Sequence, residues 1–149
     1  MLTRKGKYGL KAMILLAREH GRGPVLIGDL AEQEAIPKKF LENILLALKH
    51  RGLVQSRKGP RGGYQLGRTP DQISVGEIVR ALDGPLALVS CVSQTAYAPC
   101  EECVTEKDCA VRHVFQQVRD ETARILDGTT LAAAAGDPER VALRESEGR

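Results

Sequence analysis

Hydrophobic residues recur at spacings of three and four along the first third of the chain, a pattern typical of amphipathic helices. It predicts helices over residues 6–20, 27–35 and 37–51, the last beginning with Pro37 and ending at Gly52. The predicted apolar face of the first helix comprises Leu10, Met13, Ile14 and Ala17. The third helix leaves polar side chains open near its N-terminus, namely Lys38, Lys39, Glu42 and Asn43. Two helices joined by a tight turn, the second with such a polar face, indicate a helix-turn-helix.

A β-hairpin is predicted directly after the third helix. Residues 53–56 and 63–66 are short strand candidates, and the loop between them combines glycine, proline and three cations. We interpret the hairpin as a basic wing laid along a duplex, with phosphate contacts from Arg57, Lys58 and Arg61. A nucleotide-binding phosphate loop fits less well, because a strand follows the glycines and the P-loop motif with its lysine is absent.

Two further helices are predicted in the second half. Ser74 and Glu77 form a capping box that starts a helix ending before Asp83-Gly84-Pro85. A longer helix is expected over residues 108–126, followed by a short one over 131–135 capped by Thr129 or Thr130. On the long helix an a/d seam steps alternately by four and three residues, through Val111, Phe115, Val118, Thr122 and Ile125. The narrow seam favours a partner helix over packing on the same domain, so we expect a homodimer.

These elements divide the chain into four parts. Residues 1–84 are predicted to form a winged helix-turn-helix domain, and residues 85–108 a cysteine-rich loop. Residues 109–135 are predicted to be a dimerisation helix with an end cap, and residues 136–149 a disordered tail. The expected fold class is therefore mainly α with a small β wing.

Charge is distributed unevenly between the two halves. Residues 1–68 carry 14 Lys or Arg against 5 Asp or Glu, whereas the remaining residues carry 8 against 14. The first half is therefore net +9 and the second half net −6, which together give the +3 of the whole chain. A basic first half suits a protein that binds the phosphates of duplex DNA. Five aromatic residues in the whole chain are too few for the stacking platforms of single-strand binders.

All four cysteines lie in a single stretch with the spacing Cys91-x8-Cys100-x2-Cys103-x5-Cys109, and His113 follows. A disulfide scaffold is typical of secreted chains, but the N-terminus shows no apolar signal region, so we expect a cytoplasmic protein. No apolar run is long enough for a membrane span. Thiolates are soft ligands that suit zinc, copper(I) or iron–sulfur clusters. Four buried but unliganded cysteines are the plainer alternative.

Several segments together carry a resemblance to a known family. They are 6–10 at the start, 36–42 in the third helix, 62–66 in the wing and 126–131 near the end. With the elements in this order, the chain resembles the Rrf-type winged-helix regulators of bacteria, which include IscR, RirA, NsrR and CymR. The resemblance covers about residues 1–135. It implies a homodimer that binds a two-fold-symmetric operator on double-stranded DNA.

The resemblance also implies a ligand set. In the cluster-binding members three cysteines hold a 2Fe-2S or 4Fe-4S cluster, which assigns Cys91, Cys103 and Cys109 here. Cys100 and His113 are candidates for a fourth ligand. The chain departs from IscR-type members, whose histidine ligand corresponds in position to Arg112, and from NsrR-type members, whose N-terminal aspartate corresponds to Lys7. CymR-like members lack the cluster, so the family alone does not guarantee one.

Three functional interpretations follow. The first is a transcriptional regulator that senses iron, iron–sulfur or redox status through a cysteine-ligated iron–sulfur cluster. The second is the same regulator with structural zinc or a thiol switch. The third is a small metalloenzyme or electron carrier, which the basic first half and the wing disfavour. Because no nucleophile–base–acid series stands out, we do not expect an enzyme.

Overall fold

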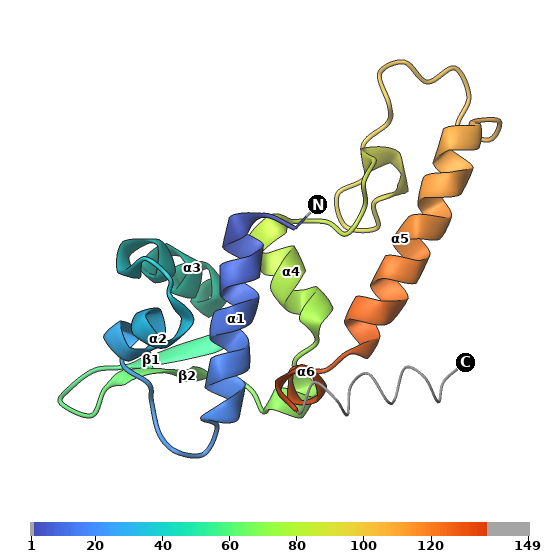
Figure 1. Cartoon of the computed structure of the whole chain (residues 1–149). Helices are drawn as coiled ribbons and strands as arrows, with labels where there is room; N and C mark the ends of the chain where they lie inside the picture. Colours follow the sequence, from blue (N-terminus) through green and yellow to red (C-terminus); the bar gives the residue numbers. More distant parts are fainter. Residues whose placement is uncertain (1, 137–149) are drawn as a thin grey trace.

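The structure is a computed structural model that describes residues 2–136, and it confirms a mainly helical fold with a two-stranded wing (Figure 1). The elements in chain order are α1 (Arg4–Arg18), α2 (Ile27–Glu34), α3 (Lys38–His50), β1 (Val54–Arg57), β2 (Gly63–Leu66), the 3₁₀ turn η1 (Pro70–Gln72), α4 (Val75–Asp83), the 3₁₀ turn η2 (Ser90–Val92), α5 (Ala110–Gly128) and α6 (Leu131–Ala135). Every predicted helix and strand is present, with ends shifted by up to two residues. No helix among residues 2–136 has the length and apolar character needed to cross a bilayer.

Helix α1 begins two residues earlier than predicted because Thr3 caps it. The Thr3 hydroxyl accepts a hydrogen bond from the backbone N–H of Gly6 at 3.1 Å, and its own backbone N–H donates to Asp83 Oδ2 at 2.9 Å. The N-terminal end of α1 is therefore fixed to the C-terminal end of α4.

The buried face of α1 differs from the predicted one. Of the four predicted residues only Met13 is fully buried, while Leu10, Ile14 and Ala17 are half-buried at the edge of the core. The buried stripe instead runs through Gly9, Ala12, Met13 and Leu16. A Cβ atom on Gly9 would overlap the side chain of Leu82, so this glycine lets α1 approach α4 closely. Close approach of α4 selects the glycine-bearing face.

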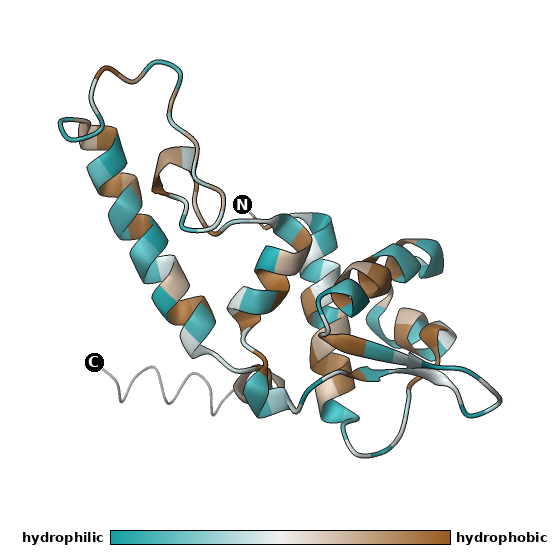
Figure 2. Cartoon of the chain, turned by 180° about the vertical axis from the view of Figure 1, so that it is seen from behind, coloured by the Kyte–Doolittle hydropathy of each residue, from teal (hydrophilic) through white to brown (hydrophobic). Residues whose placement is uncertain are grey.

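The turn between α2 and α3 forms the helix-turn-helix. Ala35 ends α2 in the left-handed conformation with φ of +53°, and the N–H of Ile36 donates to the carbonyl of Ala31 at 2.9 Å. Pro37 is the N-cap of α3 rather than its first helical residue, and Gly52 follows the helix with φ of +72°. The inner face of α3 belongs to the core, whose largest fully buried side chains include Met13, Leu30, Leu41, Ile44, Leu45, Leu48, Leu53, Ile73, Ile78 and Leu131. Figure 2 shows hydrophobic (brown) and hydrophilic (teal) segments alternating along the helices.

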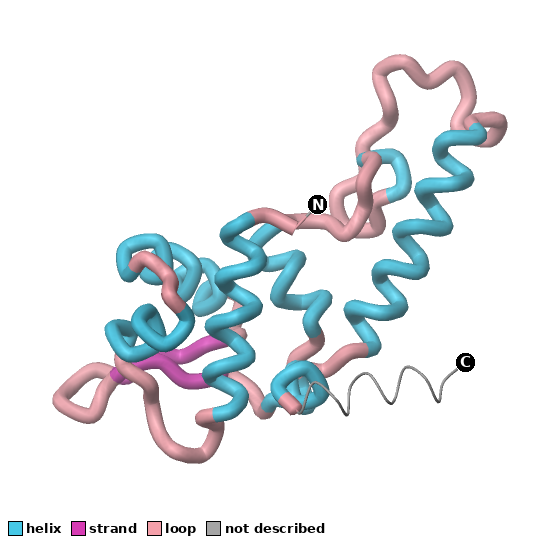
Figure 3. Tube along the Cα trace, in the orientation of Figure 1, coloured by secondary structure: helices cyan, strands magenta, loops and turns pink. Residues whose placement is uncertain are grey.

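The wing is an antiparallel pair in which Val54 lies opposite Leu66 and Arg57 opposite Gly63. Arg57 is therefore the last residue of β1 and not part of the loop. The pair is fixed to the segment before α2, because Val25 and Tyr64 exchange two backbone hydrogen bonds of 2.8 Å each. This connection holds the hairpin beside the helix-turn-helix (Figure 3).

Helix α5 leaves the body of the protein, and α6 returns to it. Thr130 caps α6, and the N–H of Leu131 donates to the carbonyl of Ile73 at 2.7 Å. Leu131 is fully buried in the same core as α1 and α3, so the short last helix packs with the helix-turn-helix body. The predicted disordered tail lies outside the described residues except for Gly136, which ends α6.

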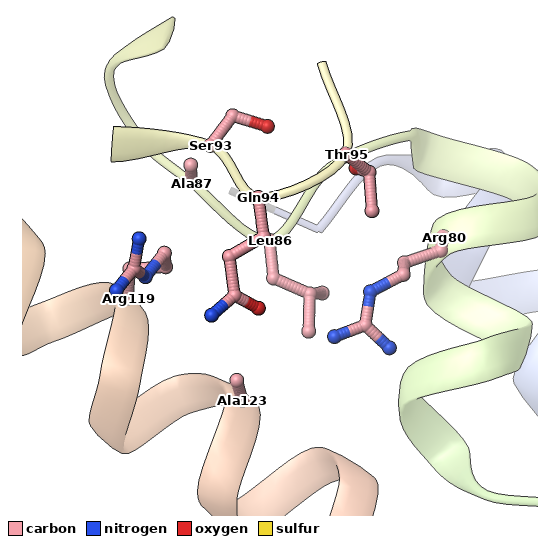
Figure 4. Close-up of a pocket in the computed structure, with 8 residues that line it drawn as sticks. All are labelled: Arg80, Leu86, Ala87, Ser93, Gln94, Thr95, Arg119 and Ala123. Atoms are coloured by element: carbon pink, nitrogen blue, oxygen red, sulfur yellow. The ribbon is translucent and has the colours of Figure 1, made fainter. Parts of the chain in front are cut away.

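A bidentate ion pair joins α4 to the C-terminal end of α5. Arg80 Nη1 and Nη2 lie 2.6 and 2.9 Å from the two carboxylate oxygens of Asp127, and these hydrogen bonds lower the pKa of Asp127. Gly76 lies beneath the pair, where an added Cβ would overlap the Asp127 carboxylate. Figure 4 shows the hollow beside this joint, with Arg80 and Arg119 on opposite sides of Leu86 and Gln94. Helix α5 is thus held against α4 at one specific separation.

The close contact of Gly76 with the Arg80–Asp127 pair predicts the effect of adding one methyl group at residue 76. Gly76→Ala is expected to lower the free energy of unfolding in urea by about 1–3 kcal/mol, because the methyl displaces Asp127. Gly28→Ala is the matched control, since Gly28 also lies in a helix but has no heavy atom near its Cβ position. That change is expected to be neutral or stabilising by about 0.5–1 kcal/mol. Equal stabilities for the two variants would contradict a tight α4–α5 joint.

Candidate functional site

The outer face of α3 carries the polar residues that the sequence predicts to bind DNA. Lys38, Lys39, Glu42 and Asn43 are all exposed, on the side of the helix opposite Leu41 and Ile44. Within residues 2–136 none of the four side chains forms a hydrogen bond or an ion pair. The polar atoms of this face are therefore free to meet an external partner.

The wing presents a second group of free cations. Arg57, Lys58 and Arg61 are exposed, and their side chains too lack an ion pair with any described residue. A backbone hydrogen bond of 2.9 Å from Gly62 to Gly59, whose φ is +104°, closes the tip of the hairpin. Three arginines elsewhere, Arg68, Arg80 and Arg119, are each bonded to a carboxylate. Cations without an internal partner fit a surface that meets phosphate groups.

Helix α3 and the wing lie on the side of the body away from α5 (Figure 1). The cysteine loop, by contrast, extends to the far end of α5 (Figure 3). The cysteines are therefore remote from α3 and the wing, and they are joined to the body through the segment after α4 and through α5. One contact ties the loop to α5, because Arg119 Nη1 donates to the carbonyl of Val92 in η2 at 2.6 Å.

All four cysteines line one open pocket of about 840 Å³ between η2, the loop and the start of α5. Cys91 is buried in η2, Cys103 and Cys109 are half-buried, and Cys100 is exposed. All four are free thiols. Of the described residues that line the pocket, Arg112 alone is cationic, whereas Glu101 and Glu102 add negative charge.

The start of α5 positions Cys109. This cysteine is the N-cap of the helix, and its Sγ accepts a hydrogen bond from the N–H of Arg112 at 3.4 Å, which is why α5 begins at Ala110 rather than at residue 108. Desolvation, followed by the neighbouring Cys109, raises the pKa of the Cys103 thiol.

The two candidate fourth ligands lie differently. Cys100 lines the pocket, and its carbonyl accepts a hydrogen bond from the N–H of Cys103 at 3.1 Å in a tight turn. His113 does not line the pocket, and its Nε2 lies 2.9 Å from the carbonyl oxygen of Lys107. The structure thus brings Cys100, but not His113, to the thiols.

The pocket fits a thiophilic metal or cluster by its donor set rather than by a finished shell of ligands. Four thiol donors around one hollow are the chemistry that soft metals and iron–sulfur clusters require. In the described part of the chain, however, no three Cys, His, Asp or Glu side chains are close enough to hold one ion together. The cysteine loop must therefore tighten before three thiols can bind the same metal ion or cluster.

Two residues at the start of α5 were missed by the sequence analysis as contributors to a site. The sequence gives Arg112 no role beyond its place where other family members have histidine. In the structure it lines the pocket, and its Nε is buried without a hydrogen-bond partner among the described residues. Val114 was left out of the predicted seam. The sequence signal for both is helical periodicity, because Arg112 lies three residues after Cys109 and Val114 three residues after Val111.

The apolar stripe of α5 is close to the predicted one but rotated. Val111, Val118 and Ile125 are exposed as expected for a free seam, at 59%, 39% and 50%. Phe115 and Thr122 are half-buried on the side that turns toward the body, and Val114, 56% exposed, completes the stripe instead. Four exposed β-branched residues along one face of a helix favour a partner surface.

Comparisons with known proteins agree on one family. The sequence model described as "Rrf2: Iron-dependent Transcriptional regulator" matches residues 2–137. The chain is 42% identical over 143 residues to an rrf2-like protein of Rhodobacter capsulatus, a match that covers 93% of this chain and 95% of the relative.

Solved structures are similar over nearly the same length. CymR, the global cysteine regulator of B. subtilis, has a TM-score of 0.76 and 36% identity, with 91% of this chain and 95% of that chain covered. The T. potens IscR structure has a TM-score of 0.70 and 32% identity, with 90% and 85% covered.

Proposed function

The chain belongs to the Rrf2 family of transcriptional regulators, and we propose that it binds duplex DNA under the control of its cysteine site. Like its relatives, it is a transcriptional regulator and not an enzyme. The observation that carries the proposal is the arrangement of two separate functional ends. Free cations and polar groups gather on α3 and the wing, whereas four thiols gather at the far end of α5.

On the DNA side, α3 enters the major groove with its N-terminal residues against the bases. Glu42 accepts a hydrogen bond from the amino group of a cytosine. Asn43 accepts a hydrogen bond from the amino group of an adenine and donates one to its N7. These are the pairings that the two side chains favour. Lys38 and Lys39 at the helix start, with the wing cations, contact phosphates and fix the orientation of the protein. Lys49 donates to Ser56 at 2.8 Å and so holds α3 against β1.

The salt dependence of binding tests this surface. Lys58→Ala is expected to weaken binding to all duplexes alike and to reduce the slope of log K against log salt by about 0.9, the value for one lost phosphate contact. Fluorescence anisotropy over a salt series measures the slope. Arg124→Ala is the control, because Arg124 is an exposed cation paired with Glu121 on α5. An unchanged slope for Lys58→Ala would remove the wing from the interface.

Two copies joined along the α5 stripe present two α3 helices, and such a homodimer reads a two-fold-symmetric operator. We place this regulator in the cytoplasm, where reducing conditions keep its thiols available. The symmetry of the protein then sets the spacing of the half-sites.

On the sensing side, Cys91, Cys103 and Cys109 are the proposed ligands of an iron–sulfur cluster, with Cys100 or His113 as the fourth. Support comes from the shared pocket, the soft donor set and the iron-dependence named in the family description. A bound cluster supplies reversible electron transfer and loss of iron as signals. The loop holds the thiols between η2 and α5, and Arg119 and Arg80 carry a change in loop shape to α5 and α4. A shift of α5 alters half-site spacing and so DNA affinity.

A second candidate is the same regulator with structural zinc or a thiol switch. Free thiols on one pocket suit either, and B. subtilis CymR is named for cysteine rather than iron. An absorption spectrum of protein purified without oxygen separates the cluster from the other two, because zinc adds no visible band, and metal analysis then separates structural zinc from a thiol switch. Visible bands with iron and sulfide support the cluster. A colourless protein with one zinc per chain supports structural zinc, and a colourless, metal-free protein supports the thiol switch.

A further inference from the structure

The outer face of α3 contains an apolar side chain among its polar ones. Leu46 is 53% exposed and continues a stripe through Lys39, Asn43 and His50 at spacings of four, three and four. The core-facing residues of the same helix, Leu41, Ile44, Leu45 and Leu48, lie on the opposite side. Helical geometry therefore places Leu46 about 4.5 Å along the axis from Asn43, on the face that meets DNA.

Leu46 lies outside the hydrophobic core of the fold. It belongs neither to the buried core nor to the partly buried residues packed against it, although its neighbours Leu45 and Ala47 do. Its surroundings on the surface are charged or polar, with Glu42, Lys39 and His50 within two turns. A single leucine in such a setting is too small for a protein-docking patch. Its size and its position on this face suit contact with a small apolar group.

Resting on the DNA-binding function proposed above, we infer that Leu46 contacts the 5-methyl group of a thymine in each half-site and so contributes to sequence specificity. Thymine alone among the four bases presents an apolar group in the major groove. Its methyl lies beside the O4 acceptor, within reach of a helix whose preceding turn holds Asn43. The leucine thus contacts the one group on this base edge that forms no hydrogen bond.

The test uses deoxyuridine, which pairs like thymidine but lacks the methyl. Duplexes selected by the full-length protein from a random library give a preferred sequence, and each thymidine in it is then replaced singly by deoxyuridine. Affinities are measured by anisotropy at one fixed salt concentration for the wild type, Leu46→Ala, Leu46→Met and Leu26→Ala. Leu26 is the matched control, because it is also a 53% exposed leucine but lies at the start of α2.

We expect one thymidine per half-site whose replacement weakens wild-type binding about four-fold, equivalent to about 0.8 kcal/mol for one buried methyl. Leu46→Ala is expected to lose a similar factor on the thymidine duplex and to show no further loss with deoxyuridine. Leu46→Met, which keeps the apolar contact, and Leu26→Ala are expected to retain the response.

Three results would overturn the inference. They are a preferred sequence without thymine in its half-site, wild-type binding that ignores every deoxyuridine, and a Leu46→Ala protein as methyl-sensitive as the wild type. Each of these leaves specific DNA binding intact. A library from which no sequence is enriched would instead overturn the proposed function together with this inference.

Discussion

Replacing Cys109 with serine is expected to abolish the visible absorption of protein reconstituted without oxygen from iron and sulfide. Cys109 has two roles, as the N-cap of α5 and as one of the four thiols that line the pocket. Serine keeps the first role, because it is among the best N-cap residues, but its hydroxyl is a poor ligand for soft metals. The loss is therefore assigned to the ligand and not to a frayed helix. Cys91→Ala and Cys103→Ala are expected to behave in the same way.

Cys100→Ala is the matched control in the same loop. Cys100 is the exposed thiol of the four, and it sits in a tight turn with Cys103, where two corners of one cluster are hard to reach. We expect this variant to keep most of its absorption, iron and sulfide. A cluster that survives loss of Cys109 but not of Cys100 would show that the ligands are misassigned. Zinc held by all four thiols would make the site structural.

The local signals in the sequence were sufficient for the elements of the fold. The Ser74–Glu77 capping box does form, with Ser74 accepting from the N–H of Glu77 at 3.1 Å. The left-handed Gly52 and the glycine-rich wing were likewise predictable, because caps and turns depend on residues close in sequence. The capping role of Thr3 was missed, since its second partner, Asp83, is 80 residues away.

The faces of the helices were harder to predict than their existence. Residues 12–17 of α1 are apolar without interruption, so periodicity does not by itself select a face. The choice is made by Gly6 and Gly9, which admit Asp83 and Leu82 of α4. On α5, the same dependence on a distant neighbour turns Phe115 toward the body and leaves Val114 outside.

The cysteine site shows the same division. Its cysteines and their soft donor chemistry are a prediction from the sequence, whereas their common pocket depends on η2, which holds Cys91 beside α5. That placement rests on the Arg119–Val92 contact, for which no local pattern exists. Leu131 also depends on a residue distant in sequence. The sequence predicts it as part of an end cap, whereas its backbone hydrogen bond to Ile73 places it in the central core.

The α5 stripe gives the second prediction with a large expected effect. In a two-fold interface each substitution occurs twice, so Val118→Asp places two carboxylates in an apolar contact. Glu121, one turn further along α5, adds like charge to each. Uncompensated buried charges of this kind cost about 3–5 kcal/mol, which corresponds to a loss of at least a hundred-fold in dimer affinity.

Val118→Asp is therefore expected to sediment as a monomer at micromolar concentration and to lose cooperative binding to a two-fold operator. Its secondary structure should remain native, because Val118 is not part of the core. Gln117→Asp is the control, since it adds the same charge to an exposed position on the adjacent face of the same helix. That variant is expected to stay dimeric, because its carboxylate remains in water. A dimeric Val118→Asp protein would place the interface elsewhere, and dissociation of both variants would show that added charge, rather than the stripe, controls assembly.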